Sequence, residues 1–423
     1  MKTIRSRSRN TYNVLPDQIE DTSLNYVPHR YILEGGGNVL NCITGEIVKD
    51  ISWGNDRSEL IRRWFLVPEE FDISGLMYLM RQERLSRLNF AYSSEYTIFT
   101  TMRCNAGCSY CFQDGRRTDS HMSEKVALDV ASYIKRHRNP SSNVTMKWFG
   151  GEPLMNQDAM RTICKSLRLS DIPYRSYMST NGDLLPSVPD SDIYLWNLKI
   201  VQLTVDYPGK KYEETKVLPP GAYDRLLETS KRLEEFNVEK RIRIHYHPED
   251  GVEPIYKIIE DFKDTKRTTI YISPLNDAKL TKEDFDKILR VEDLLIEYGK
   301  SSDPLPVNGK PTQCMGDSRN VKTITPDGGL SPCEHYFYEQ NYGSIYSDEY
   351  NNDILCSWRS KRKHSLKCTD CPLFPSCELL TNCPAIAKCE SGYDYYRIEK
   401  IKRGLRHLGG SNEQRETYRN RLV

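Results

Sequence analysis

The chain has 423 residues, of which 28% are charged and 10% aromatic, and its formal net charge is +1. This composition is typical of a globular protein of two or three domains, and its balanced charge does not favour nucleic acid or an anionic membrane as a partner. No run approaches the ~20 apolar residues of a membrane-spanning helix, and the basic start MKTIRSRSRN lacks the apolar core of a signal peptide.

Thirteen cysteines occur in a chain that shows no export signal. Secreted proteins use many cysteines in disulfides, whereas proteins of a reducing compartment use them mainly to bind metals. We therefore expect a cytoplasmic protein whose cysteines ligate metal.

The region before residue 96 reads as a small separate module. Residues 1–25 are polar, and we expect a disordered or extended N-terminus there. Three β-prone runs with glycine turns follow, at 30–34, 38–43 and 46–51, and then two helical patterns at 58–64 and 73–82. This order is that expected of a winged-helix module, so residues 26–92 are predicted to form an α+β, winged-helix-like unit. An N-terminal extension that only packs on the domain after it is the alternative.

The stretch TMRCNAGCSYCF, from Thr101 to Phe112, places Cys104, Cys108 and Cys111 at the spacing CxxxCxxC. Thiolates are soft ligands that suit iron–sulfur clusters or zinc. Three close cysteines can hold three irons of a [4Fe–4S] cube, and the fourth iron then keeps a position for a ligand from outside the chain. A structural zinc site is the alternative.

From residue 96 to about 300 the pattern is strand, loop and helix, repeated. The predicted strands are 96–100, 143–149, 174–179, 198–206, 239–246 and 268–274, and the clearest helices are 123–138, 155–167 and 222–236. Six such units predict an α/β fold, a partial (β/α)6 barrel open on one side. Loops after parallel strands build the sites of such barrels. Cys164 lies at helical spacing with Ile163 and Leu167, and we interpret it as a core residue.

Two further strings follow the cysteine loop at the ends of predicted strands. They are Gly150-Gly151-Glu152-Pro153 and Ser179-Thr180-Asn181-Gly182. Together with CxxxCxxC, and with Tyr110 just before Cys111, they resemble the motifs of the radical S-adenosylmethionine (radical SAM) family. The resemblance implies a [4Fe–4S] cluster whose open iron binds the amino and carboxylate groups of SAM.

The same resemblance implies roles for individual residues. Tyr110 would pack on the adenine, the GGEP backbone and Glu152 would hold the amino group, and a hydroxyl of the Ser179-Thr180 string would reach the ribose. Asp206 occupies the aspartate position of the family's fourth strand, although Tyr207 replaces the usual glycine, and Lys216 stands where the family often has arginine. Arg243 would pair with the carboxylate of SAM, a task suited to a guanidinium fork; a surface strand charge is the alternative.

The C-terminal part is rich in cysteine. Its eight cysteines are Cys314, Cys333, Cys356, Cys368, Cys371, Cys377, Cys383 and Cys389. Eight thiolates can hold two cubes, although two zinc ribbons would use the same eight. Gly328-xxxx-Cys333 and the later CxxCxxxxxC resemble the SPASM extension, which implies an auxiliary-cluster domain at 310–395, before a C-terminal helix and tail at 396–423.

The SPASM resemblance implies a ligand set. Cys368, Cys371, Cys377 and Cys389 would hold the distal cluster. Cys314, Cys333 and Cys383 would hold the proximal one, with Cys356 as its fourth ligand or a bystander. Five residues separate Cys383 from Cys377, and this spacing departs from the family pattern.

These features predict a radical SAM maturase of ribosomally made peptides. Its 5′-deoxyadenosyl radical would abstract hydrogen and lead to an oxidative change such as a thioether or carbon–carbon crosslink. The module at 26–92 would bind the peptide by strand addition, Glu334 would serve as a general base, and a flavodoxin or ferredoxin would donate electrons. An anaerobic sulfatase maturase, which converts Cys or Ser to formylglycine, is one alternative; a non-catalytic iron–sulfur or zinc protein is another.

Overall fold

The computed structural model describes residues 1–6, 15–88, 94–113, 118–274, 279–301, 315–317, 321–335, 341–360, 367–377 and 392–408. The chain forms two compact units, each of which draws on separate parts of the sequence. We call Leu88–Leu280 with Met315–Ser360 the barrel unit, and Met1–Arg87 with Thr281–Cys314 and Lys361–Val423 the N-terminal unit. The domain boundaries expected from the sequence stay predictions.

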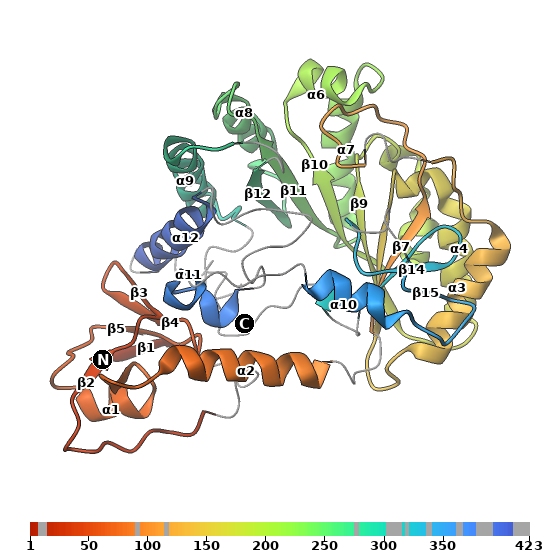
Figure 1. The fold of residues 1–423 in the computed structure, drawn as a ribbon. Coiled ribbons are helices and arrows are strands. Elements are labelled where there is room, and N and C mark those ends of the chain that lie inside the picture. Colours follow the sequence, from red (N-terminus) through yellow and green to blue (C-terminus); the bar gives the residue numbers. More distant parts are fainter. Residues whose placement is uncertain are drawn as a thin grey trace. The chain divides into compact units, whose positions relative to one another are not determined.

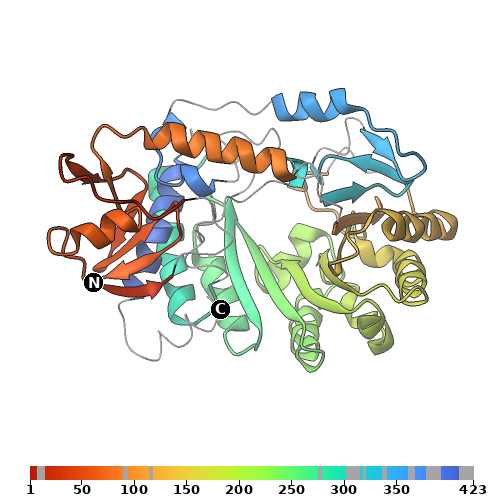
Figure 2. The ribbon, with the colours of Figure 1, turned by 90° about the horizontal axis from the view of Figure 1, so that it is seen from below.

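The barrel unit is built on a curved sheet with helices along its outer side (Figures 1 and 2). Its strand order is β12-β11-β10-β9-β8-β7-β13-β14-β15. The six predicted barrel strands are confirmed and run parallel. They are β7 (Glu95–Thr101), β8 (Val144–Gly150), β9 (Tyr174–Thr180), β10 (Leu198–Thr204), β11 (Glu239–Tyr246) and β12 (Thr268–Pro274).

Six α-helices connect these strands in the described residues. They are α3 (Glu124–His137), α4 (Gln157–Arg168), α5 (Asp190–Leu195), α6 (Gly209–Lys216), α7 (Ala222–Glu235) and α8 (Glu253–Phe262). Ser123 caps α3 as expected, since its hydroxyl accepts a hydrogen bond from the amide of Val126. The predicted start of α4 at residue 155 is wrong, because Pro153–Asn156 form a 3-10 turn and Asn156 then caps the helix. Cys164 is fully buried in α4, as expected.

Residues after the barrel extend its sheet beyond β7. Here β13 (Val321–Ile324) pairs parallel with β7, and it continues into β14 (Gly329–Ser331) and β15 (Gly343–Ser344). Helix α10 (Asn352–Ser360) follows. Gly328 makes the turn between β13 and β14 at φ +90°, in the region that favours glycine.

The N-terminal unit contains the three strands and two helices predicted before the barrel, together with strands that the sequence did not reveal. An antiparallel sheet has the order β1-β5-β4-β3, and a separate pair joins β2 and β6. The strands are β1 (Lys2–Arg5), β2 (Tyr26–Pro28), β3 (Ile32–Gly35), β4 (Asn38–Asn41), β5 (Ile47–Lys49) and β6 (Leu66–Pro68). The helices are α1 (Arg57–Arg62) and α2 (Ile73–Leu88).

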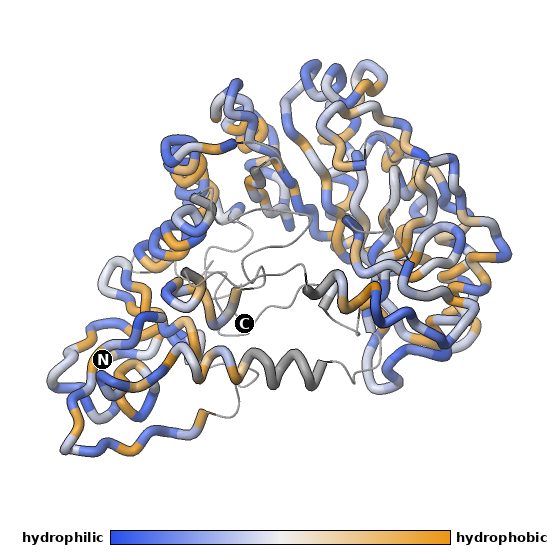
Figure 3. Tube along the Cα trace, viewed as in Figure 1, coloured by the Kyte–Doolittle hydropathy of each residue, from blue (hydrophilic) through white to orange (hydrophobic). Residues whose placement is uncertain are grey.

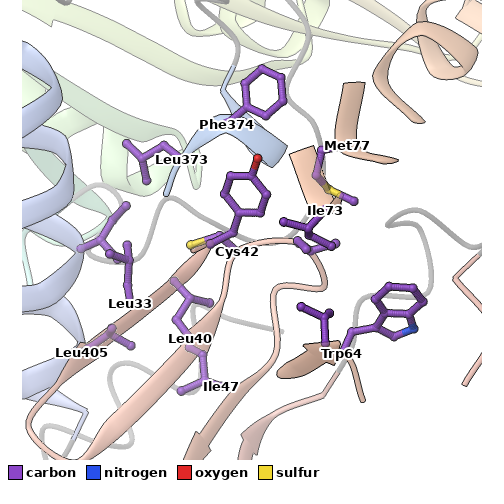
Figure 4. Packing of buried hydrophobic residues seen from close by; sticks show 14 of the residues in the cluster. Leu33, Leu40, Cys42, Ile47, Trp64, Ile73, Met77, Leu373, Phe374 and Leu405 are labelled. Carbon is purple, nitrogen blue, oxygen red and sulfur yellow. The ribbon is translucent and has the colours of Figure 1, made fainter. Parts of the chain in front are cut away.

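The core of the N-terminal unit is completed by segments from far along the chain. These segments are α9 (Lys282–Glu297), α11 (Lys367–Asp370), the 3-10 turn Phe374–Ser376 and α12 (Tyr393–His407). Apolar residues recur along α9 and α12 (Figure 3), and the Phe285 and Tyr396 rings stack at 5.5 Å. Leu373 and Leu405 share one buried cluster with Leu40 of β4 (Figure 4). The unit therefore depends on residues that are hundreds of positions apart.

In the described part of the chain, no helix combines the length and the apolar character needed to cross a bilayer.

Candidate functional site

A cavity of about 680 Å³ lies where the parallel strands of the barrel unit end. Several of the residues predicted from the sequence line it together. They are Cys104, Cys108, Tyr110, Cys111, Gly150, Gly151, Ser179, Thr180, Asn181 and Arg243. Three loops that are remote in sequence therefore meet at one place, the usual position of the active site in barrels of this kind. Glu152, Pro153, Asp206 and Glu334 are not among the lining residues.

The cysteine loop and the GGEP loop are joined through their backbones. The amide of Gly151 donates to the carbonyl of Thr101 at 3.0 Å, and the amide of Glu152 donates to that of Arg103 at 2.8 Å. A Cβ atom on Gly151 would lie 2.2 Å from the Arg103 carbonyl oxygen, and one on Gly150 equally close to that of Thr101. Glycine is required at both positions because any side chain would push the cysteine loop away.

Glu152 is buried and holds the loop after β9. Its carboxylate accepts hydrogen bonds from the Thr180 hydroxyl at 2.8 Å, from the amide of Asn181 at 2.9 Å and from the amide of Leu154 at 3.1 Å. Burial raises the pKa of Glu152 to about 7, although these hydrogen bonds act to lower it. These bonds fix the positions of Thr180 and Asn181, and the contact with SAM that the resemblance implied for Glu152 stays a prediction.

Asn181 anchors the cysteine loop from the other side. Its side-chain amide donates to Asn105 Oδ1 at 2.8 Å, and Asn105 in turn donates to Asp183 at 2.9 Å. The Asn181 carbonyl accepts the Tyr212 hydroxyl at 2.5 Å. All the side-chain hydrogen-bonding groups of Asn105 and Asn181 are used in these bonds or in the loop itself, so the loop is held before any ligand arrives.

Four polar residues lie together beside the cysteine loop, and two of them, Asp206 and Lys216, are buried. Asp206 Oδ1 accepts from the backbone amide of His245 at 2.8 Å and from its Nδ1 at 2.9 Å, so Nδ1 carries the proton. Lys216, only 3% exposed, donates to the Tyr110 hydroxyl at 3.2 Å. Burial alone would raise the pKa of Asp206, but the His245 hydrogen bond and the Lys216 charge hold it well below its usual range.

Burial lowers the pKa of His245 against the opposing effect of Asp206. Asp206 is therefore the ionised partner and His245 the neutral one. Asp206 Oδ2 has no hydrogen-bond partner among the described residues.

Arg243 lines the cavity from β11. Its Nη2 donates to Ser273 at 3.3 Å, and its buried Nε finds no partner in the described structure. Lys147 and Arg243 both act to lower the pKa of Glu334, but burial outweighs them and raises it. The neighbouring His335 reaches the cavity and packs on Phe112 with a ring separation of 4.4 Å. A cation with unused donors at the cavity wall can take a ligand carboxylate.

The residues fit the expected cofactors. Three thiols line one wall, two side-chain-free glycines allow close approach of a ligand, and the Arg243 Nε and Asp206 Oδ2 atoms lack partners within the described residues. No three metal-ligating side chains converge tightly enough for a single ion in the part of the chain that is described.

The C-terminal cysteines are only partly visible. Cys314, Cys383 and Cys389 lie outside the described residues. Cys333 is buried and Cys356 is exposed on α10, both in the barrel unit. Cys368, Cys371 and Cys377 are partly buried in the N-terminal unit. The predicted assignment of thiolates to the two auxiliary clusters stays a prediction.

Sequence reasoning missed several residues of the cavity. Gln202 and Thr204 line it because they alternate on one face of β10, and His245 lies two residues after Arg243 on β11. Strand alternation could have found these residues. Lys216 could not be placed beside Tyr110 from spacing alone. It is the last residue of α6, and the helix ends there with a left-handed turn at Val217, φ +54°.

The comparisons with known proteins agree with this geometry. The family described as the radical SAM superfamily matches residues 98–262, from β7 to the end of α8. A protein of Methanocaldococcus jannaschii, named as a glycyl-radical enzyme activating enzyme, is 24% identical over 48% of this chain and 78% of its own length. A GTP 3′,8-cyclase of Clostridium perfringens is 21% identical over 61% of this chain and 84% of its own.

Solved structures share the fold over a larger part of the chain. The structure of anSMEcpe with bound AdoMet and the Cp18Cys peptide has a TM-score of 0.55 at 16% identity, covering 73% of this chain and 98% of that one. SuiB of Streptococcus suis has a TM-score of 0.51 at 16% identity, covering 86% and 95%. Residues 98–262 therefore form a domain of the radical SAM superfamily, and the protein is an enzyme of the kind that uses a [4Fe–4S] cluster and SAM.

Proposed function

We propose that the protein modifies a ribosomally made peptide in a reducing cytoplasm, through hydrogen abstraction from an unactivated carbon. The observation that carries this proposal is the antiparallel sheet β1-β5-β4-β3, all of which precedes the radical SAM domain in the chain. A small sheet with an edge strand can take up an extended peptide through backbone hydrogen bonds, with little demand on the peptide's sequence.

The cofactors would be held by the cavity residues of the barrel unit. Cys104, Cys108 and Cys111 would ligate the cluster, Arg243 would face the carboxylate of SAM, and Tyr110 would pack on its adenine. When bound and reduced, these cofactors supply a 5′-deoxyadenosyl radical. The chain's own part is to orient SAM and to exclude water: Glu152 fixes the loop that carries Thr180 and Asn181.

Auxiliary clusters would accept the electron left on the substrate, and a flavodoxin or ferredoxin would supply the first one. Glu334 is proposed as the general base. Burial raises its pKa, the direction that favours acceptance of a proton.

The experiment uses the full-length, anaerobically reconstituted protein with SAM, a reductant and the precursor peptide encoded beside it. Mass spectrometry should show loss of hydrogen from the peptide together with one 5′-deoxyadenosine per event. The matched control is the variant with Cys104, Cys108 and Cys111 all changed to alanine. Deoxyadenosine formed without any change in the peptide would argue against this substrate.

The second candidate is an anaerobic sulfatase maturase. The fold likeness to anSMEcpe, described with a bound peptide, favours it. A peptide from a sulfatase, with the target cysteine, should then be converted to formylglycine. Hydrogen–deuterium exchange separates the candidates further. The peptide maturase predicts that binding of the precursor protects the amides of an edge strand of the β1-β5-β4-β3 sheet from exchange. Strand β10 of the barrel is the internal control, and its exchange should not change.

A further inference from the structure

Cys42 lies under the cysteine-rich turn of the N-terminal unit, and no motif of the sequence accounts for it. It follows β4 and is fully buried. Its amide donates to the Tyr31 carbonyl at 2.9 Å, and Asn41 Oδ1 accepts from the next amide, that of Ile43, at 2.9 Å. The thiol is therefore held at a fixed point of the sheet.

The segment that carries Cys368, Cys371 and Cys377 is tied to the same sheet. The Tyr31 hydroxyl donates to the Thr369 carbonyl at 2.9 Å, and the Tyr31 and Phe374 rings lie 6.2 Å apart. Arg30 forms an ion pair with Asp370. These three contacts hold the turn against the strand ends of the sheet.

Cys42 and this turn meet in one apolar cluster. Cys42, Leu373 and Phe374 belong to its buried residues (Figure 4). Cys368 and Cys371 are partly buried and pack against it. Cys42 and two cysteines of the turn therefore border the same apolar cluster.

The surroundings also favour a charged cluster. Arg397 of α12 donates to Cys377 Sγ at 3.3 Å, a contact that stabilises thiolate charge. A four-iron cube takes its thiolates at separate corners, so donors from a strand end and a turn suit it. Zinc would need the four sulfurs around one ion.

The cysteine count points the same way. Cys356 is exposed on α10 of the barrel unit and makes a poor ligand for a buried cube. With Cys42 in place of Cys356, the chain still offers eight thiolates besides Cys164 and the three-cysteine loop, enough for two cubes of four. From these observations we propose that Cys42 is the fourth thiolate ligand of the auxiliary cluster held by Cys368, Cys371 and Cys377. This inference rests on the auxiliary clusters of the proposed function.

The test removes Cys42 from protein that already lacks the SAM cluster, so that only auxiliary iron is measured. Cys42→Ala is compared with Cys164→Ala, an equally buried thiol in α4, and with Cys389→Ala, all in the background with Cys104, Cys108 and Cys111 changed to alanine. The readouts are iron and sulfide per chain and the electron paramagnetic resonance spectrum of the reduced protein.

The expected result is that Cys42→Ala loses about one to four irons per chain or shifts the spectrum of one cluster, while Cys164→Ala matches its parent. Cys42→Ser, which keeps an oxygen donor of similar size, should retain the iron with a shifted spectrum, and it stands in for an alanine variant that fails to fold. A Cys42→Ala spectrum and iron content equal to those of Cys164→Ala would overturn the proposal. A parent protein without auxiliary iron would instead refute the auxiliary clusters themselves.

Discussion

Replacing Gly151 with alanine should separate the two loops that form the candidate SAM site. The added Cβ would lie 2.2 Å from the Arg103 carbonyl oxygen and 2.6 Å from that of Met102. Ordinary contact begins at 3.4 Å, so the backbones would have to part by about 1.2 Å. The clash is with backbone, which no side-chain rotation can relieve.

This displacement sets the expected magnitude. The moving backbone leads directly into Cys104, and the hydrogen bonds from Gly151 and Glu152 to the cysteine loop would lengthen. A misplacement of ~1 Å in a reacting group costs about 100-fold in rate. We therefore expect 5′-deoxyadenosine formation by Gly151→Ala to fall about 100-fold.

The assay is anaerobic turnover of SAM with a chemical reductant, with deoxyadenosine measured by liquid chromatography and corrected for iron content. Gly54→Ala is the control, because a Cβ there meets nothing within 4 Å. If Gly151→Ala cleaves SAM within about two-fold of the parent rate, far less than the cost of a misplaced group, the loops are not coupled as described.

Two further changes test the buried charges of the site. Glu152→Gln should flatten the pH dependence of stability. The folded carboxyl keeps its proton up to about pH 7, whereas the unfolded one keeps it only to about pH 4.5. The parent's free energy of unfolding should therefore fall by roughly 3 kcal/mol as pH rises through this range, and denaturation midpoints that move equally with pH in both proteins would contradict this. Lys216→Met removes the buried ammonium that donates to Tyr110. It should weaken SAM binding at least about tenfold, the effect of losing one charge-assisted hydrogen bond. Equilibrium dialysis measures the dissociation constant of SAM for this variant and for the control Lys210→Met, which changes an exposed lysine of the same helix; equal constants would exclude a role for Lys216 in SAM binding.

The sequence revealed the parts of the fold that repeat a local pattern. Strand 239–246, EKRIRIHY, was predicted to the residue, because Ile242, Ile244 and Tyr246 alternate with polar residues at the period of a half-buried strand. The cysteine loop and Gly151 were found because they belong to short motifs, and their meeting in one cavity follows from the shared end of parallel strands.

Other features depend on contacts that local patterns do not encode. The pairing of β13 with β7 joins residues 321–324 to the start of the barrel, and α12 completes a core that begins with β4. Strand β1 of four residues is too short and polar to stand out. The internal hydrogen bonds of Glu152 and the position of Lys216 arise from such tertiary contacts, so only the structure reveals them.

The most direct test of the account is the chemistry of the three-cysteine loop. The full-length protein, reconstituted without oxygen, is incubated with SAM and a reductant, and iron, sulfide and 5′-deoxyadenosine are measured together, beside the variant with Cys104, Cys108 and Cys111 changed to alanine. The account predicts about twelve irons per chain, for three cubes, and deoxyadenosine from the parent alone; the variant should retain about eight irons and form no deoxyadenosine. Stoichiometric zinc without iron, or undiminished deoxyadenosine from the variant, would contradict it.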